Sequence, residues 1–454
     1  MKPTLSLTVN SESMNSDPAK IAKLEMDLND FAPDVRANAL RVLRAHAACG
    51  TVTARASVAA ANLHCHTFFS FNAHGHSPSS VAWQGWRRGY LMMGIVDFDT
   101  LDGVDEFLAA CEAVGLRGSA GIETRVFVPE LASCEINSPG EPGVAYHLGI
   151  GFASGKIPEE NRHLLLDMRQ RAHQRNRALI DRVNAHLDPV KLDYEADVLP
   201  LTPGGNATER HIVLAYIQVA ERIVPSTTAF WADRLGVARG EMAVLMENTS
   251  AFRGRIRDKL MKRGGIGYVQ PGYETFPSVA EFHRLIVACG ALPCAAWLDG
   301  ASEAERAPDE LLALHIGKGV VALNIIPDYA RRRPQDLRRV VQLAEELDLP
   351  VHVGTEMNNP NQAMIDDFSA PEFAAVRDAF LAGAHFVYGH IVMQRALGSG
   401  YQSEWARAHL ESRRERKEFF TAVGRRAIPG KQYLSALPRR LDQTMSPDDI
   451  LARL

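Results

Sequence analysis

Several features that would place this chain in a special class are missing from its sequence. Its six cysteines include no Cys-x-x-Cys pair, so we expect free thiols in a reducing compartment. No apolar run approaches the roughly 18 residues of a membrane span. The N-terminus lacks the basic-then-apolar order of a secretory signal. These absences predict a cytoplasmic protein with no membrane partner.

An excess of charge of either sign is also lacking. The formal net charge is −4 over 454 residues, and no long basic track with interleaved aromatics occurs, which argues against a nucleic-acid partner. The short basic run 413–417 is expected to be a solvated helix face. With 46% hydrophobic and 23% charged residues, the composition is that of an ordinary globular protein. Nothing in the sequence specifies an oligomeric state.

The segment Asn62–Ser70 is the most informative stretch of the chain. It carries His64 and His66, directly after the apolar-leaning run 58–61. In a strand, residues i and i+2 point to the same face, so both imidazoles could bind one metal ion. A His-x-His pair alone is equally compatible with two unrelated histidines. The residues that follow along the chain favour the metal site.

Strand-like and helical segments alternate through most of the chain, a pattern that predicts a parallel α/β barrel. In such a barrel the active site forms at the C-terminal ends of the strands. After the His-x-His strand, the predicted strands are 92–98, 119–127, 144–152, 291–297, 320–326, 350–356 and 386–391.

One long interruption of this alternation defines the predicted domain organisation. Residues 155–265 look almost wholly helical, and we expect them to form a cap that leaves the barrel and returns to it. The predicted units are an N-terminal helical extension (1–55), the first part of the barrel (56–154), the helical insertion (155–265), the second part of the barrel (266–400) and a C-terminal helical tail (401–454).

Residues able to ligate a metal collect at the predicted strand ends. A carboxylate such as Glu123, which follows Gly-Ile in a buried strand, must be paired or coordinated there. Asp97 and Arg125 are the candidate catalytic residues, and Asp99 is a further candidate for the site. Both aspartates could instead only anchor a turn, and Arg125 could bind phosphate or form an ion pair. The strand-end residues are His64, His66, Asp97, Glu123, His147, Glu356 and His390.

Five motifs in order carry a family resemblance. They are His-Cys-His-Thr (64–67), Val-Asp-Phe-Asp-Thr (96–100), Gly-Ile-Glu (121–123), His-Leu-Gly-Ile (147–150) and Thr-Glu-Met-Asn (355–358). Together they resemble the polymerase-and-histidinol-phosphatase (PHP) family of metal-dependent phosphoesterases. The resemblance spans about residues 62–390 and implies a distorted (β/α)7 barrel.

The resemblance also implies a first metal ion, held by His64, His66, Glu123 and Glu356. Glu356 stands where the family has an aspartate. Carboxylate and imidazole ligands suit Zn, Mn or Fe.

The positions that hold the second and third metal ions in the resembling family lack some of their ligand residues in this chain. A second ion would keep His147, but Trp297 stands in place of a histidine, and an indole is a donor only. His390 is a candidate replacement. The third site is dismantled, although His74 or His76 could stand in for one ligand. We therefore expect one or two divalent ions per chain. The residues at the third-site positions are Phe71, Phe98 and Asn358.

The sequence thus predicts a metal-dependent hydrolase of a small phosphoester, such as a nucleotide or sugar phosphate. The small phosphorylated substrate is its expected partner. Two alternatives stay open. One is a catalytically weakened PHP-like module that binds metal or nucleotide, because several ligand positions are lost. The other is an amidohydrolase-like enzyme acting on a C–N bond, because such enzymes also use a His-x-His pair at a strand end.

Overall fold

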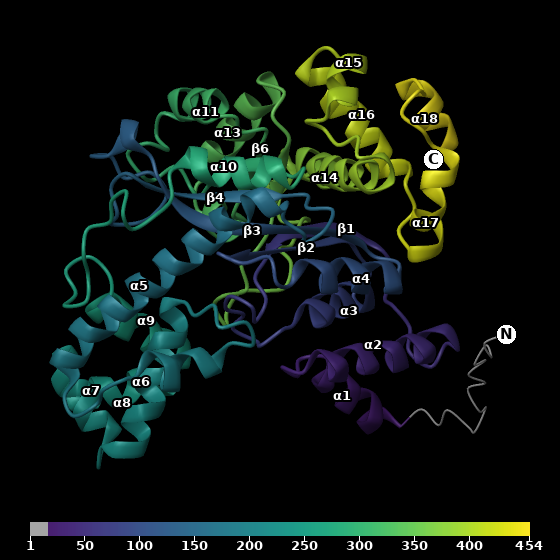
Figure 1. Cartoon of the computed structure of the whole chain (residues 1–454). Coiled ribbons are helices and arrows are strands. Elements are labelled where there is room, and N and C mark those ends of the chain that lie inside the picture. Colours follow the sequence, from purple (N-terminus) through teal and green to yellow (C-terminus); the bar gives the residue numbers. More distant parts are fainter. Residues whose placement is uncertain (1–16) are drawn as a thin grey trace.

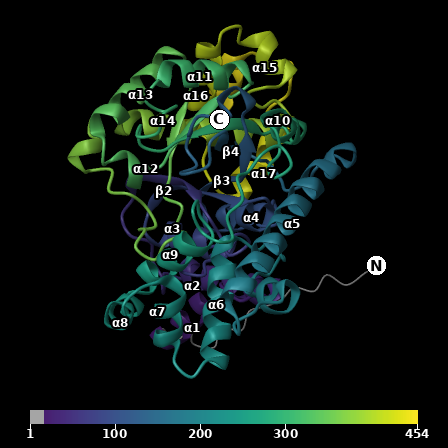
Figure 2. The same cartoon turned by 90° about the vertical axis from the view of Figure 1, so that its left-hand side faces the viewer.

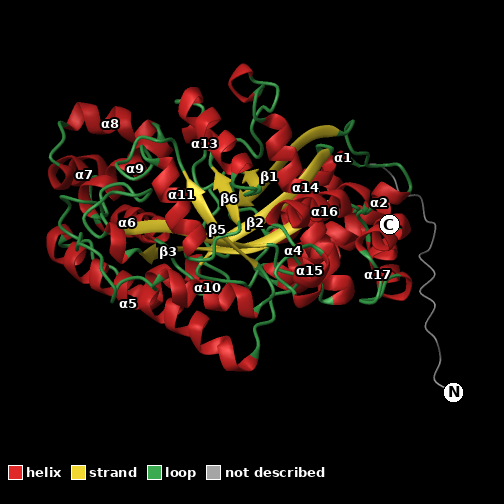
Figure 3. Ribbon diagram, turned by 90° about the horizontal axis from the view of Figure 1, so that it is seen from above, coloured by secondary structure: helices red, strands yellow, loops and turns green. Residues whose placement is uncertain are grey.

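Seven strands form one sheet in chain order, and the sheet curls into a nearly closed barrel (Figure 3). The computed structural model describes residues 17–454 of the protein. The predicted distorted α/β barrel is confirmed. Its strands are β1 (Val58–Cys65), β2 (Tyr90–Phe98), β3 (Arg117–Phe127), β4 (Val144–Ile150), β5 (Leu292–Trp297), β6 (Ala322–Ile325) and β7 (Val351–Val353).

The barrel is closed where β1 meets the segment after β7. Gly354 has no room for a side chain, because a Cβ would lie 2.3 Å from both Asn62 Oδ1 and the His64 amide nitrogen. This close approach lets Asn62 donate from Nδ2 to the Thr355 carbonyl at 3.0 Å, and the His66 amide to the Glu356 carbonyl at 3.0 Å. The chain after β7 is thereby fastened beside the two histidines of β1.

Helices surround the barrel (Figure 1). Two of these helices begin at N-terminal capping residues that can be recognised in the sequence. Ser77 accepts a hydrogen bond from the Ser80 amide ahead of Pro78, and Ser278 and Glu281 form a capping box. The covering helices are α3 (Pro78–Arg87), α4 (Val104–Val114), α10 (Val279–Ala288), α11 (Pro308–Gly317), α13 (Pro334–Glu346) and α14 (Arg377–Leu397).

Strand β4 corrects the prediction of an all-parallel barrel. It pairs antiparallel with both β3 and β5. The connection from β3 contains only the short 3-10 turn Pro129–Leu131, whereas a parallel connection needs a crossover of a dozen or more residues, usually a helix. The end of β4 therefore lies beside Leu292, at the start of β5. The insertion leaves the barrel at the end opposite to its mouth.

The predicted strand 386–391 is wrong, because these residues lie inside helix α14. The run Phe386–Ile391 is buried on all sides, between the sheet and helix α16 (Arg413–Arg426). Periodicity cannot distinguish a buried helix segment from a buried strand. His390 consequently sits in a helix, where its Nδ1 accepts a hydrogen bond from the Tyr401 amide at 3.0 Å, and it is not at a strand end.

Five of the helices between β4 and β5 surround a hydrophobic core of their own, which contains Trp231 and Tyr216 (Figures 1 and 2). We call these helices the cap. Its first helix is 26 residues long and contributes Leu164 and Met168 to the barrel core but Ile180 to the cap core. The cap helices are α5 (Arg162–Leu187), α6 (Glu209–Ile223), α7 (Thr227–Leu235), α8 (Arg239–Glu247) and α9 (Thr249–Leu260).

The described part of the chain, residues 17–454, is helical at both of its ends. Residues 1–16 of the predicted N-terminal extension lie outside the described residues. The basic run 413–417 begins α16, where Arg414 and Lys417 both pair with Asp348. Among the described helices, none is long and apolar enough to cross a bilayer. The remaining helices are α1 (Pro18–Asp27), α2 (Pro33–Ala48), α12 (Pro327–Ala330), α15 (Glu404–His409), α17 (Lys431–Arg440) and α18 (Pro447–Arg453).

Burial of His390 makes the protein sensitive to acid. Burial lowers the pKa of His390 to about 4, so the unfolded chain takes up a proton below its ordinary pKa of roughly 6.5 while the folded chain does not. The free energy of unfolding should fall by about 1.4 kcal/mol per pH unit for this residue as pH drops from about 6.5 to 4. Urea titrations at several pH values should show a shallower slope in His390→Gln.

The matched control is His163→Gln, at an exposed position on α5. It should keep the slope of the parent protein. Equal slopes in all three proteins would contradict a neutral buried His390.

Candidate metal centre

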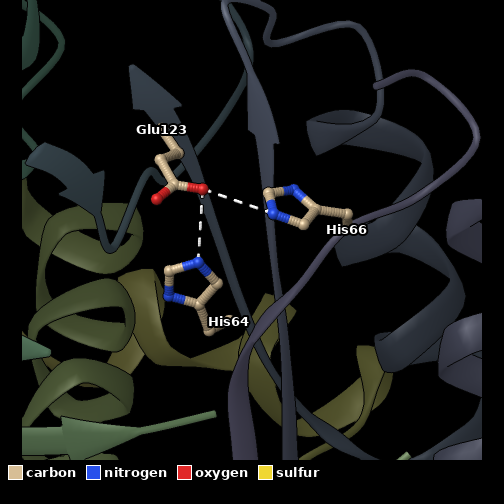
Figure 4. Close-up of side chains that lie close together, drawn as sticks. All are labelled: His64, His66 and Glu123. Atoms are coloured by element: carbon tan, nitrogen blue, oxygen red, sulfur yellow. Dashed lines mark hydrogen bonds and ion pairs between the residues drawn. The ribbon is translucent and has the colours of Figure 1, made fainter. Parts of the chain in front are cut away.

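Three side chains converge at the C-terminal ends of β1 and β3 (Figure 4). Oε2 of Glu123 lies 3.2 Å from His64 Nε2 and 3.3 Å from His66 Nε2. All three residues are at least 98% buried. Within residues 17–454 they are the one group of His, Cys, Asp and Glu whose ligand atoms all lie within 4.8 Å of one another. The strand alternation that puts both histidines on one face is the one predicted from the sequence.

A neighbouring amide fixes the tautomer of His64. Its Nδ1 lies 2.7 Å from Asn324 Oδ1, an acceptor, so Nδ1 carries the hydrogen. The orientation of the amide is set by His352, whose Nδ1 lies 3.1 Å from Asn324 Nδ2. In the neutral ring, the lone pair of His64 Nε2 therefore points at the Glu123 carboxylate.

The Ser70 hydroxyl and the buried Asp97 carboxylate fix the tautomer of His66. Ser70 Oγ donates to Asp97 Oδ1 at 2.6 Å and lies 3.3 Å from His66 Nδ1, so it is left to accept from that nitrogen. Asp97 also accepts from the Thr67 amide at 2.7 Å and from its hydroxyl at 2.6 Å. Asp97 thus holds the loop after β1, as the turn-anchoring alternative expects, and it orients His66 through Ser70.

This arrangement fits a divalent metal ion. Two Nε2 lone pairs and one carboxylate oxygen face each other in a buried space, and they repel unless a cation lies among them. His66 Nε2 has no hydrogen-bond partner within the described chain. Burial works to raise the pKa of Glu123, but the positive charges of His64 and His66 in their protonated forms hold it at about 2. The carboxylate is therefore ionised, as a ligand must be, and a metal ion would replace those protons.

Glu356 lies at the same end of the barrel but outside this tight group. Its Oε2 accepts from Asn358 Nδ2 at 2.9 Å, and Asn358 Oδ1 accepts from Arg210 at 2.8 Å. The negative charge of Glu356 contributes to raising the pKa of His64, against the larger opposing effect of burial. Met357, between them, has a φ of 56°, a left-handed conformation that concentrates at functional sites.

The structure does not bring His147 and His390 to this group. His147 pairs with Thr124, so it lies on the sheet face opposite to Glu123, and its Nδ1 lies 3.2 Å from His283 Nε2 on α10. Trp297 also faces away, into the core with Leu312.

Aromatic packing occupies two of the three lost third-site positions. Phe98 stacks on the His66 ring, with 4.7 Å between ring centroids. Phe71 contacts His211 at the edge of its ring, with 5.1 Å between centroids. Asn358, at the third position, instead joins Glu356 to Arg210.

A cavity of about 410 Å³ opens beside the metal centre. Its floor is built by strand-end residues of the barrel and its wall by residues of the cap, so α5 has carried the chain from the far end of the barrel to its mouth. Other arginines of α5 do not line it. Arg169 pairs with Asp102, and Arg171 with Glu281. Lining residues include Asp99, Glu123, Arg175, Glu209, Arg257 and Glu356.

Several cations line this cavity or lie beside it. Arg125 pairs with Glu141 at 2.9 Å, and Glu209 pairs with Arg257 and Lys262, each at 2.8 Å. The sequence left open whether Arg125 binds phosphate or forms an ion pair, and here it forms the pair. We call Arg125, Arg175, Arg257 and Lys262 the cation wall. Arg210 and Asp258 also line the cavity. Outside the metal centre, five cations thus face four carboxylates, Asp99, Glu141, Glu209 and Asp258, which leaves a surplus of one positive charge.

Arg175 is the cation that the cap helix α5 contributes to the cavity. Its guanidinium lies 4.8 Å from the centre of the Phe276 ring, and the guanidinium of Arg125 lies 4.4 Å from the same centre. Burial and the neighbouring Arg125 lower the pKa of Arg175 to about 10, so it stays charged at neutral pH. Asp99, with φ 53°, faces it, and burial raises the pKa of that carboxyl.

Sequence reasoning missed the residues that orient the ligands and build the wall. Asn324 lies within a predicted strand, where a polar residue among apolar neighbours was a usable signal. Ser70, four residues after His66, was inside the segment singled out. No sequence pattern pointed to Arg257, Lys262 or Phe276. The sequence does not determine how the helical insertion packs against the barrel, and therefore does not show which of its side chains reach the cavity.

Removing the Asn324 amide tests its role in orienting His64. We expect Asn324→Leu to weaken metal binding by about 10–100-fold while the fold persists, since partners of ligating histidines have effects of this size. Competition with a chromophoric chelator measures the affinity. Asn38→Leu, at an exposed position on α2, is the control, and equal affinities in the two variants would contradict the assigned role.

Comparisons with known proteins give fold-level similarities. No protein-family model matches the chain. No curated protein sequence matches it either. An amidohydrolase from Chromobacterium violaceum, solved with bound sulfate and no metal, has a TM-score of 0.49 and 16% identity over 69% of this chain and 92% of its own. A protein from Bifidobacterium adolescentis described as a metal-dependent phosphoesterase has a TM-score of 0.47 and 19% identity over 68% and 92%.

Proposed function

We propose that this protein is a metal-dependent hydrolase that acts on a small phosphoester, such as a nucleotide or sugar phosphate. One observation carries the proposal. The Nε2 atoms of His64 and His66 meet the Glu123 carboxylate at the edge of a cavity that the residues of the cation wall also line. The first feature fits a divalent ion, and the second fits an anionic substrate. We propose one or two ions of Zn, Mn or Fe per chain, with Glu356 as a further ligand.

A divalent ion supplies a water of lowered pKa, near ~7 for zinc, and stabilises charge on phosphoryl oxygens. The residues of this chain have separate tasks. Asn324 and Ser70 hold the two imidazoles in the ligating tautomer. Arg175 binds an anionic oxygen of the substrate. The cap shuts the cavity from one side, which strengthens each of these electrostatic contacts by excluding water.

A cavity of about 410 Å³ suits a small molecule and is too small for a polymer chain. This size and the mixed charge of the protein support a small phosphorylated molecule as the substrate and argue against a nucleic acid. The second candidate is a metal- or nucleotide-binding module without turnover. It is favoured by one observation, the Phe98 ring stacked on His66 at a position where the resembling family has a ligand.

A panel of substrates separates these functions. Phosphomonoesters, phosphodiesters and cyclic amides are each tested with Mn, Zn or Fe supplied. Turnover of phosphoesters supports the proposal, and turnover of amides alone overturns it in favour of the amidohydrolase-like alternative. If no substrate is turned over but a nucleotide raises the melting temperature, the binding module is the better description.

Two arginines of the same helix test the role of the cation wall. Arg175→Met should raise KM for a phosphorylated substrate by ~10–150-fold, because a hydrogen bond between charged groups contributes about 1.5–3 kcal/mol. Arg177→Met is the matched control, since Arg177 is paired with Glu195 at 2.7 Å and is about half exposed. Steady-state kinetics provides the measurement, and equal KM values in the two variants would rule out Arg175 as a substrate contact.

A further inference from the structure

A second group of imidazoles lies on the outer face of the sheet, away from the metal centre. His147 comes from β4, His283 from α10 and His315 from α11, and their exposed fractions are 0%, 7% and 2%. The His147 ring lies 5.3 Å from that of His283 and 4.9 Å from that of His315, measured between centroids. Three separate elements thus bury their histidines against one another.

The hydrogen bonds of this group are incomplete. His283 Nδ1 donates to the Lys318 carbonyl at 3.0 Å, so its Nε2 presents a lone pair to His147 Nδ1, 3.2 Å away. His147 Nε2 and both ring nitrogens of His315 have no hydrogen-bond partner in the part of the chain that the structure describes. Each buried polar atom left unpaired costs about 1–3 kcal/mol, and such groups in a native protein point to an unseen water or ion.

The surroundings keep these imidazoles in the neutral form. Burial first, and then the neighbouring histidines and Lys318, lower the pKa values of His147 and His315. The rings are therefore neutral at physiological pH, the form that ligates Zn, Ni or Cu. The bond from His283 Nδ1 to a backbone carbonyl is the usual support of a ligating histidine.

We propose that His147, His283 and His315 form a second metal site, for a divalent transition ion that prefers imidazole ligands, such as zinc. The ion would bridge β4 to the helices α10 and α11. The 3.2 Å between His147 Nδ1 and His283 Nε2 is close to the ~3.3 Å edge of a tetrahedron with Zn–N bonds of about 2.0–2.1 Å.

Binding requires a movement of one side chain. Among the described residues, only the group at the metal centre already has all its ligand atoms within 4.8 Å of one another. His315 contacts His147 with its ring at 66°, so its side chain turns to bring a nitrogen to the ion. The proposed site is therefore formed on binding and independent of the hydrolase function, because His147 lies on the opposite sheet face from Glu123.

The experiment removes the first site and asks whether zinc still binds. The double variant His64→Ala/His66→Ala, without a polyhistidine tag, is stripped with chelator, loaded with zinc and dialysed. Elemental analysis should give about one zinc per chain, and zinc should raise the melting temperature. Adding His315→Phe, which preserves the ring volume, should remove this zinc and lower the affinity by at least ~10-fold. Cobalt in place of zinc should give a visible absorption spectrum that this variant loses.

Three outcomes decide against the site. The first is that the double variant retains no zinc. The second is that zinc does not change its melting temperature. The third is that zinc retention is the same with and without His315→Phe. The last result identifies surface binding. If His315→Phe fails to fold, His283→Gln is compared by the cobalt spectrum, and an unchanged spectrum overturns the proposal.

Discussion

His64→Ala should abolish bound metal at the first centre and reduce kcat/KM by about 10³-fold or more. The reason is that a catalytic ion contributes several kcal/mol to the transition state, and His64 provides one of three buried ligand atoms that lie within 4.8 Å of one another. The fold should survive, because the strand is held by Asn62 and by its apolar neighbours. Elemental analysis, circular dichroism and steady-state kinetics on the same preparation measure the three quantities.

His74→Ala is the matched control, since His74 is exposed and lies in the loop after the same strand. It should keep both metal and activity. If His64→Ala retains a full complement of metal at the first centre and its activity, the group formed with His66 and Glu123 is a hydrogen-bonded core cluster and no metal centre.

Glu209→Gln should lower stability and raise affinity for anions together, which is an unusual combination. Glu209 is the acidic partner of Arg257 and Lys262 at 2.8 Å and lies 3.8 Å from Arg125. Breaking a buried pair by removing one partner costs roughly 3–5 kcal/mol. The same change takes a negative charge from a partly buried cation wall, so inorganic phosphate should bind ~10-fold more tightly. Phosphate should then restore much of the lost melting temperature.

Glu221→Gln, at an exposed position on the same helix α6, is the control and should change neither property. Thermal melts over a phosphate titration provide the measurement. A loss of stability with weaker phosphate binding would contradict an anion site at this wall.

The features that follow from a regular spacing of apolar and polar residues were predictable from the sequence. The spacing of His64 and His66 and the position of Glu123 at the end of a buried strand predicted that the three would meet, and the structure brings them together. The barrel and the helical nature of 155–265 followed from the same periodicities. These features depend on local patterns that each segment carries by itself.

Features that depend on chain direction were not predictable. The reversal of β4 puts His147 on the outer face, although the strand itself lies where it was expected. Alternation says which residues share a face, but it does not say which face is the inside once a hairpin replaces a crossover. The same limit applies to Trp297, which faces the core behind the sheet while Ala296 lines the cavity.

Helix α5 belongs to two hydrophobic cores, and we expect the parts of the molecule around these cores to open at different rates. Leu164 and Met168 belong to the barrel core, whereas Ile180 and Val183 belong to the cap core. Proteins open transiently in cooperative units that follow their cores, so the boundary falls inside a continuous helix. Amide hydrogens in the C-terminal half of α5 should exchange together with those of the cap. If the cap opens as such a unit, Arg175 should leave the cavity while His64, His66 and Glu123 stay in the barrel. The proposed ion would then remain bound after the proposed substrate has left.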